Sequence, residues 1–243
     1  MTEDEWLTSD DPDSLLFFLQ DRVSERRGRL FAVACLQRIW HLMTDERSRR
    51  ITEVVERHIE GQATTDEWRT ASVAAEEAWA DTSRLLHPRM YRAPERTLSP
   101  EERAAADVLH FTTSAAHNIG YAAFRANPGH EGRALAHTVA REAARAVNED
   151  YPNSPERPVQ AALLRDIFGN PFRPVTLDPS WLTSTVVLLA RGTYEDRAFD
   201  RLPILADALQ DAGCEHPDLL AHCRGPGPHV RGCWVVDLIL GKD

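Results

Sequence analysis

The stretch SPEERAAADVLHFTTSAAHNI, residues 99–119, decides the fold class of this 243-residue chain. It opens with Ser99, Pro100 and Glu102, a helix N-terminus in which the serine hydroxyl and the glutamate carboxylate each satisfy a free backbone amide. The mostly apolar positions that follow recur every three or four residues and lie on one helix face: Ala105, Val108, Leu109, Thr112, Ala116 and Ile119. The stretch therefore predicts a long amphipathic helix with one face in a core.

Helix-start signals continue on both sides of this stretch. Thr64 with Glu67 forms a second capping box, Thr44 precedes an acidic first turn, and Asp178 with Pro179 marks a further start. Strand-like alternation is almost absent. We therefore expect an all-α fold, a multi-helix array with a smaller, proline-punctuated C-terminal helical unit. The helices are predicted over 12–23, 27–43, 45–60, 65–87, 100–126, 130–149, 156–168, 179–191, 196–211, 217–223 and 231–240.

One of these helices is expected at the centre of the fold. The predicted helix over 27–43 is apolar around most of its circumference between Leu30 and Met43. A helix that is apolar on most sides is buried on most sides. We therefore expect Leu36, Ile39 and Trp40 in the core.

A composition break divides the chain. Residues 151–158, YPNSPERP, hold three prolines in eight positions, which the interior of a helix does not accept. An alanine-rich helical array precedes the break, and shorter helices joined by proline-rich turns follow it. We therefore expect two domains, residues 1–150 and residues 151–243, that pack together.

Composition also limits the partners and the compartment. The net charge of −10 gives an acidic surface that repels phosphate backbones, so we expect no nucleic-acid partner. No segment approaches the roughly 18 apolar residues of a membrane span, and no apolar signal segment follows the acidic start. We therefore expect a cytoplasmic protein without membrane association. Its four cysteines are then expected to be free thiols or metal ligands.

The most distinctive segment is CEHPDLLAHCRGPGPHVRGCW, residues 214–234. Its Gly/Pro-rich loop connects two predicted helices, and a helix N-terminus after such a loop can bind an anion. Arg224, His229 and Arg231 are the candidate anion-binding residues, because each offers charge-assisted hydrogen bonds. The alternative is a rigid connection whose arginines pair with nearby acids, since two prolines remove amides that an anion site would use.

The same segment holds five side chains of the types that bind zinc: Cys214, His222, Cys223, His229 and Cys233. Two thiolates and two imidazoles can close a tetrahedral site. The Cys-x-x-Cys hairpin of zinc knuckles is absent, however, and cysteine is often buried without any ligand. Zinc is therefore a candidate cofactor, and core cysteines are the alternative.

A third group of polar residues lies on the predicted helix over 100–126. His110, Ser114, His117 and Tyr121 share one face, and His137 on the next helix is expected at a similar height to His117. A metal site or a general base is conceivable there. Two arginines beside His137 oppose a cation, so a solvated or partner-facing surface is the alternative.

Several segments resemble a known group of proteins. The motifs are RDIFGNPFRP at 165–174, FDRLPILADA at 199–208 and HCRGPGPHVRGCW at 222–234, with EWL at 5–7 near the start. They are similar to segments that recur in uncharacterised planctomycete-type bacterial helical proteins. The resemblance implies a bacterial context and no particular chemistry.

These observations favour an intracellular helical interaction module that binds a protein or peptide partner, because helix arrays offer grooves for such partners. The alternative is a small-molecule- or anion-binding protein, or a zinc-dependent enzyme, centred on residues 214–233. No motif with a mechanistic spacing identifies a nucleophile or a general base, so the sequence leaves the question of enzyme activity open.

Overall fold

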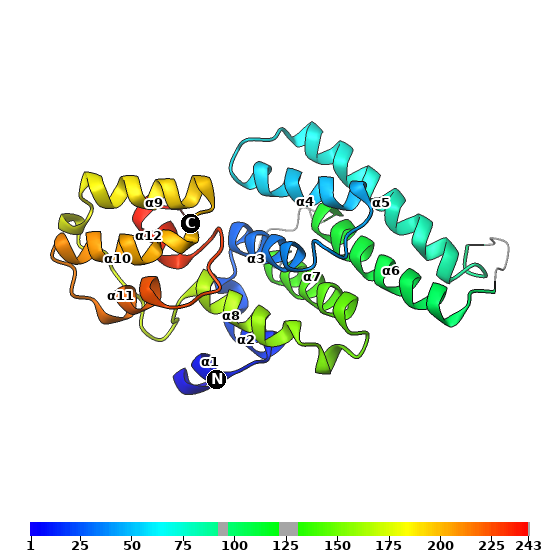
Figure 1. Ribbon diagram of the computed structural model, residues 1–243, viewed down its shortest axis with the longest axis horizontal. Coiled ribbons are helices and arrows are strands. Elements are labelled where there is room, and N and C mark those ends of the chain that lie inside the picture. Colours follow the sequence, from blue (N-terminus) through cyan, green and yellow to red (C-terminus); the bar gives the residue numbers. More distant parts are fainter. Residues whose placement is uncertain (92–96, 122–130, 243) are drawn as a thin grey trace. The chain divides into compact units, whose positions relative to one another are not determined.

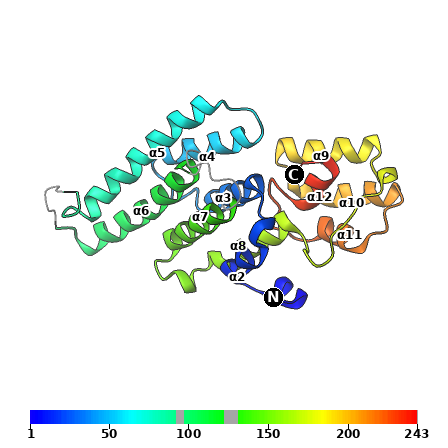
Figure 2. The same cartoon turned by 180° about the vertical axis from the view of Figure 1, so that it is seen from behind.

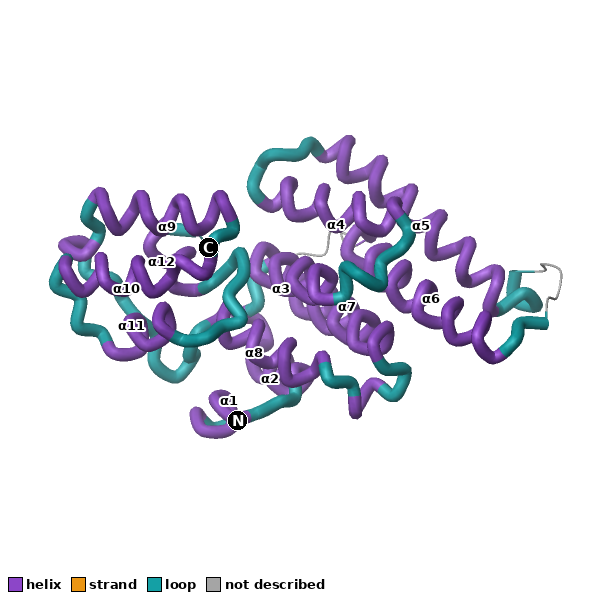
Figure 3. The backbone as a smooth tube through the Cα atoms, viewed as in Figure 1, coloured by secondary structure: helices purple, strands orange, loops and turns teal. Residues whose placement is uncertain are grey.

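The structure, a computed structural model, describes residues 1–91, 97–121 and 131–242 (Figure 1). Among these residues it contains helices joined by turns and loops, and it contains no strand (Figure 3). The all-α class expected from the sequence is confirmed. Within the same ranges, no helix combines the length and the apolar character that crossing a bilayer requires.

The described α-helices follow in chain order: α1 (Glu3–Thr8), α2 (Pro12–Leu19), α3 (Glu25–Arg38), α4 (Glu46–Ile59), α5 (Thr65–Leu86), α6 (Pro100–Tyr121), α7 (Glu131–Val147), α8 (Glu156–Phe168), α9 (Ser184–Asp196), α10 (Leu202–Asp211), α11 (Pro217–Arg224) and α12 (Trp234–Leu240). Short 3-10 helices lie between them: η1 (Gln20–Arg22), η2 (Tyr151–Asn153), η3 (Pro179–Trp181) and η4 (Phe199–Arg201).

Most predicted helices are present, and some of their boundaries differ from the prediction. Asp178 caps only the 3-10 helix η3, and Thr183 caps α9, so the predicted helix start at 179 is wrong by five residues. α1 was not predicted, although Thr2 and Glu5 form a capping box at its start. The predicted boxes of Thr64–Glu67 and Ser99–Glu102 are confirmed.

Packing contacts divide the chain into two compact units. The continuous unit consists of residues 16–160, and the discontinuous unit consists of residues 1–15 with residues 161–243. α1 therefore packs with residues from the end of the sequence. The division into domains at 1–150 and 151–243 stays a prediction.

Helices α3 to α7 form the body of the continuous unit. α5 packs along α6, α6 along α7, and α3 crosses α7 (Figures 1 and 2). Gly28 of α3 lies so close to α7 that a Cβ atom there would stand 2.8 Å from the Cα of Gly132. A Cβ on Gly132 would in turn stand 2.8 Å from the carbonyl oxygen of Ser24. The two glycines therefore permit a backbone contact that no other residue allows.

α3 is buried along most of its length. Its residues from Leu30 to Leu36 are all buried, as is Ile39 just after its end. α3 ends at Arg38 and not at residue 43, however, so Trp40 lies in a turn and is only half-buried beneath the Arg49 guanidinium. The prediction of a buried Trp40 is wrong because the helix stops before it.

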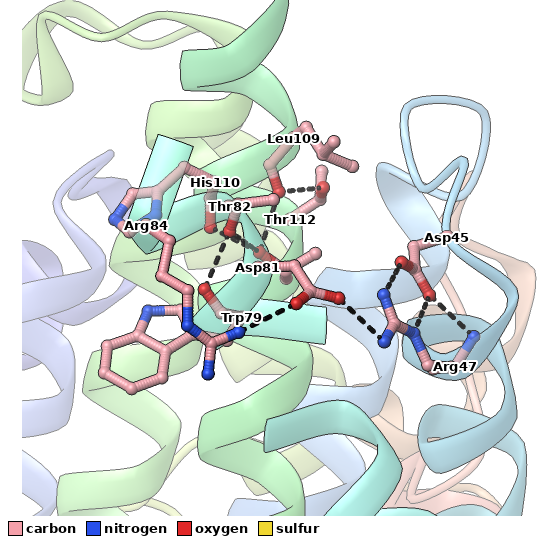
Figure 4. A network of polar contacts seen from close by, with 10 residues as sticks. Asp45, Arg47, Trp79, Asp81, Thr82, Arg84, Leu109, His110 and Thr112 are labelled. Atoms are coloured by element: carbon pink, nitrogen blue, oxygen red, sulfur yellow. Dashed lines mark hydrogen bonds and ion pairs between the residues drawn. The ribbon is translucent and has the colours of Figure 1, made fainter. Parts of the chain in front are cut away.

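Polar contacts join α4, α5 and α6 at one end of the unit. Asp45 caps α4 by accepting a hydrogen bond from the backbone amide of Arg47. The Arg47 side chain lies between Asp45 and Asp81 of α5, 3.0 Å from the second carboxylate (Figure 4). The hydroxyls of Thr82 and Thr113 hydrogen-bond between α5 and α6 at 3.0 Å. Polar side chains therefore cap the start of α4 and link α4 to α5 and α5 to α6.

The discontinuous unit has its own core. α9, α10, α11 and α12 bury one apolar cluster between them (Figures 1 and 2). Its members are Val186, Ala190, Tyr194, Leu202, Leu205, Ala206, Leu209, Cys214, Leu219, Leu220, Cys223, Cys233, Val235, Val236 and Ile239. Three of the four cysteines belong to this core.

Candidate metal centre

Four side chains of three chemical types converge in the discontinuous unit: Asp166, His222, His229 and Cys233. Asp166 comes from α8, His222 from α11, and His229 from the loop after α11. Cys233 is the N-cap residue of α12. One donor atom from each lies within 4.8 Å of every other. Two stretches of the sequence, α8 and residues 222–233, thus present donors to one point.

The closest separations within the group all involve atoms that can bind a metal. Asp166 Oδ1 lies 2.7 Å from His229 Nδ1 and 3.1 Å from His222 Nε2. His222 Nε2 lies 3.2 Å from Cys233 Sγ. Zinc–ligand bonds of about 2.0–2.3 Å place the donors of a tetrahedral site roughly 3.3–3.7 Å apart. The observed separations, from 2.7 to 4.8 Å, bracket that value.

The geometry around His222 distinguishes a metal site from a catalytic triad. In a Cys–His–Asp triad the nucleophile and the acid bind opposite nitrogens of one imidazole ring. Here Cys233 Sγ and Asp166 Oδ1 both approach Nε2 of His222. A single N–H cannot serve two acceptors well, whereas a metal ion between the three atoms binds all of them. The arrangement therefore matches coordination and does not match proton relay.

Second contacts orient two of the donors. Nε2 of His229 lies 3.3 Å from the carbonyl oxygen of Gly225, which only accepts, and this contact favours the tautomer with its proton on Nε2 when a metal replaces the proton on Nδ1. A neutral ring then has a lone pair on Nδ1, the nitrogen that faces the group. Asp166 Oδ2 accepts a hydrogen bond from the amide of Val230 at 3.0 Å. Metal-binding imidazoles and carboxylates are typically held by such outer contacts.

The group is almost closed to solvent. The Asp166 side chain is 2% exposed, and those of His222 and His229 are 17% and 10% exposed. Burial alone raises the pKa of the Asp166 carboxyl, but the hydrogen bonds and charges of the two histidines outweigh it and hold the pKa below its ordinary value. Burial opposes the charged form of His229 too, and Asp166 nevertheless raises its pKa. The buried Asp166 carboxylate thus faces two imidazole rings that favour its charged form.

The cysteine of the group is not a nucleophile of the ordinary kind. Burial raises the pKa of the Cys233 thiol well above its usual range, and the neighbouring Asp166 carboxylate raises it further. A reactive cysteine needs a lowered pKa and access to solvent, and Cys233 has neither. A bound cation would stabilise its thiolate, as coordination does for thiols in general.

The conformation of the loop between α11 and α12 places His229 beside Asp166. Gly227 has a φ of +81°, a conformation that side chains disfavour. A Cβ atom at this position would stand 2.9 Å from the amide nitrogen of His229. The glycine therefore lets the backbone turn back on itself, and the turn brings His229 next to α8.

The structure separates the three candidate anion-binding residues. Arg224 donates hydrogen bonds to the side chains of Asp207 and Gln210, at 2.8 and 2.7 Å. Arg231 donates to the backbone carbonyl oxygens of Tyr194 and Glu195 at the end of α9. His229 faces Asp166, as described above. Each has an internal partner, so the geometry gives an anion site no support.

The five candidate metal ligands are divided. His222, His229 and Cys233 belong to the group of four, and Cys214 and Cys223 lie in the apolar core outside it. Burial raises the pKa of Cys223 to about 12. Each of the four cysteines, all within the described residues, is a buried free thiol.

Sequence reasoning missed Asp166. This residue lies 56 positions before His222, on a helix that shows only ordinary amphipathicity. The available signal was its position at the edge of the apolar stripe of Leu163, Leu164 and Ile167, where a carboxylate is costly to bury without partners.

The third group predicted from the sequence does not come together as a site. His117 stacks on Trp79 with ring centroids 5.0 Å apart, and His110 meets the edge of His87 at 5.9 Å. The side chain of Tyr121 lies outside the described residues. The two described contacts are apolar in character, and burial lowers the pKa of both His110 and His117.

No protein-family model matches the chain, and comparisons with curated proteins and with solved structures find no match either. The interpretation of the four-residue group therefore rests on its own geometry.

Proposed function

We propose that this chain is a helical interaction protein in which a zinc ion holds the discontinuous unit together. The observation that carries the proposal is the convergence of Asp166, His222, His229 and Cys233 within 4.8 Å, with two of the donors on one imidazole nitrogen. Binding a protein or peptide partner in the cytoplasm, as expected from the sequence, is part of the proposal.

The donor set favours zinc over the other common cations. Calcium and magnesium take oxygen ligands, and this group offers two nitrogens, one sulfur and one carboxylate. Mixed imidazole, thiolate and carboxylate ligands suit zinc, which imposes no strong geometric preference of its own. Asp166, His222, His229 and Cys233 would hold the ion, and the ion would supply the positive charge that their buried carboxylate and thiolate require.

A structural role is favoured over a catalytic one by the number of ligands. A catalytic zinc keeps a coordination position open for water or substrate, whereas four protein ligands close a tetrahedral site. All four donors here come from the protein, and the group is nearly closed to solvent. The site therefore supports the interaction module better than a zinc-dependent enzyme.

Exposed apolar side chains on the same unit support a binding role. Leu188 on α9 is 64% exposed, and Ile204 on α10 is 55% exposed. α9 and α10 pack against each other, and each carries one of these exposed side chains. We expect Leu188→Asp to weaken crosslinking to a specific protein partner, whereas replacing the exposed Thr176 by Ala leaves crosslinking unchanged.

Metal analysis of the full-length protein tests the zinc site. We expect one zinc per chain, and a cobalt-substituted protein with the intense visible absorption of four-coordinate cobalt. Cys233→Ser and His229→Ala should each weaken zinc affinity by tenfold or more, as loss of a direct ligand removes at least about 1.4 kcal/mol. The matched control is Cys214→Ala, which removes a buried thiol of the same unit outside the group.

Two outcomes would contradict this proposal. Failure of the protein to bind zinc in competition with a weak chelator would contradict the proposed zinc site. A cobalt spectrum typical of five-coordination, together with exchangeable water on the metal, would instead favour the zinc-dependent enzyme.

A further inference from the structure

The turn that follows the metal ligand Asp166 also binds the N-terminal helix α1. Arg165, the residue before Asp166, donates from one guanidinium nitrogen to the carbonyl oxygens of Trp6 and Ser9, at 3.1 and 2.8 Å. The indole N–H of Trp6 donates to the carbonyl oxygen of Gly169 at 3.1 Å, and Trp6 is fully buried. The proposed metal ligand Asp166 lies three residues before Gly169.

Charged and amide side chains extend this contact. Glu3 of α1 accepts a hydrogen bond from Asn170 at 2.6 Å and pairs with Arg173 at 2.5 Å. Both partners lie in the loop directly after α8. Every contact named for α1 is therefore made to residues 165–173, a segment that begins one residue before Asp166.

The residue after a second proposed metal ligand packs against the same turn. Trp234 follows Cys233, and a Cβ atom on Gly169 would stand 3.1 Å from Cγ of its indole ring. The ring also lies 5.2 Å from the ring of His222, measured between centroids. Gly169 thus has the Trp234 ring against its Cα, and its carbonyl oxygen bonds the Trp6 indole.

We propose that α1 is a clasp whose closure is coupled to metal binding: zinc at the four-residue group fixes the turn at 165–173, and loss of zinc releases residues 3–9. The inference rests on the proposed zinc site and adds a regulated segment to it. The contacts run without interruption from Cys233 through Trp234 and Gly169 to Trp6.

α1 cannot stay folded by itself. A six-residue helix is far below the length at which isolated helices form in water, and chain termini are disordered unless contacts hold them. Its structure therefore depends on the turn that Arg165 and Gly169 provide. If that turn has one arrangement with metal and several without, docking of α1 is favoured only in the metal-bound protein.

Thermodynamic linkage makes the coupling reciprocal. If zinc strengthens the docking of α1 by some factor, docking must strengthen zinc binding by the same factor. Substitutions in α1, none of whose residues belongs to the four-residue group, should therefore weaken zinc affinity. A helix that only covers the surface would leave that affinity unchanged.

Hydrogen exchange on the full chain measures the release directly. We expect backbone amides of residues 3–9 to exchange at least about fivefold faster after zinc is removed with a chelator, within the range of typical coupling factors. Amides of α5 in the continuous unit serve as the internal reference and should exchange at the same rate in both states.

Zinc affinity, measured by chelator competition, tests the reciprocal effect. Trp6→Phe keeps an apolar ring and removes the N–H that binds Gly169, and Glu3→Gln weakens the pairing with Arg173 without touching the core. We expect both to weaken zinc binding, by about fivefold or more for Trp6→Phe. One control is Trp68→Phe, because the indole N–H of Trp68 has no hydrogen-bond partner. The other is Glu46→Gln, because exposed Glu46 forms an ion pair with Arg49 within α4.

The results separate this proposal from the previous one. Unchanged exchange at residues 3–9 and unchanged zinc affinity in both α1 variants, in a protein that binds zinc, would overturn the clasp and leave the metal site standing. Failure of the unsubstituted protein to bind zinc would overturn the metal site, and the coupling with it. Faster exchange together with weaker affinity would support the clasp.

Discussion

The two units of this protein bury different kinds of close contact. In the continuous unit, Gly28 and Gly132 bring two helix backbones together with no side chain between them. In the discontinuous unit, buried polar contacts join the Asp166 carboxylate to His222 and His229. The first contact involves no charged group, whereas the second buries a carboxylate that a cation would stabilise. Stability in one unit should thus depend on shape, and in the other on charge.

Histidines follow the same division. His110 and His117 in the continuous unit pack against other rings, and burial lowers the pKa of each. His229 in the discontinuous unit faces a carboxylate that raises its pKa despite burial. The same side chain is therefore kept neutral in one unit and is prepared to bind a proton or a metal in the other.

The largest effect is expected from a substitution that breaks the contact between Gly28 and Gly132. Gly28→Ala should destabilise the continuous unit by about 3 kcal/mol, because its methyl group meets the backbone of α7 and the helices must separate. Urea unfolding followed by circular dichroism measures the loss. Gly192→Ala is the control, because no atom lies within 4 Å of that Cβ and alanine favours the helix by up to about 1 kcal/mol. Equal effects of the two substitutions would contradict the close crossing.

Metal removal should destabilise the discontinuous unit and leave the continuous unit unchanged. Zinc at about a hundred times its dissociation constant stabilises a folded state by about 2.7 kcal/mol, so a chelator should remove that amount from the discontinuous unit. Amide exchange across residues 175–240 should accelerate, while exchange across 46–86 stays unchanged. Acceleration in both ranges would mean that the two units unfold as one.

A smaller effect is expected from one helix cap. Ser99→Ala removes the hydroxyl that accepts a hydrogen bond from Glu102 at 3.1 Å and should cost about 1 kcal/mol. Thermal unfolding in the presence of zinc measures it. Thr176→Ala, at an exposed loop position, should change nothing. A neutral Ser99→Ala would show that the start of α6 is satisfied by other groups.

Acidification should weaken the continuous unit through its buried histidines. The folded pKa values of His110 and His117 lie below that of an unfolded imidazole, about 6.5. The unfolded chain therefore binds more protons as the pH falls from 7 towards 5, and the stability that these groups contribute above pH 6.5 is lost in that range. His110→Gln with His117→Gln should flatten the pH profile. An unchanged profile in the double variant would assign the acid sensitivity to other groups.

Helix starts in the fold were predictable because their signals are local. Ser99 with Glu102 and Thr64 with Glu67 satisfy amides within one turn, and the structure shows both boxes. The end of α3 was not predictable from such signals, because no glycine or proline follows Arg38 and the apolar pattern continues to Met43. A terminus without a local signal is decided by tertiary packing.

The candidate site divides in the same way. His222, His229 and Cys233 lie within twelve residues, so their types and spacing drew attention to them. Asp166 joins them only through the path of the chain, which no local pattern encodes. A carboxylate beside an apolar helix stripe is the kind of residue whose role appears only once its neighbours are known.

The hydrogen bond from Trp6 to Gly169 spans 163 positions of the chain, and all of the continuous unit lies between its ends. Closing so long a loop carries an entropy cost that local contacts avoid, and contacts of this kind form late in folding. If residues 16–160 have already folded, they no longer behave as a long flexible loop. We therefore expect the inserted segment to fold first and the two pieces that flank it to join afterwards.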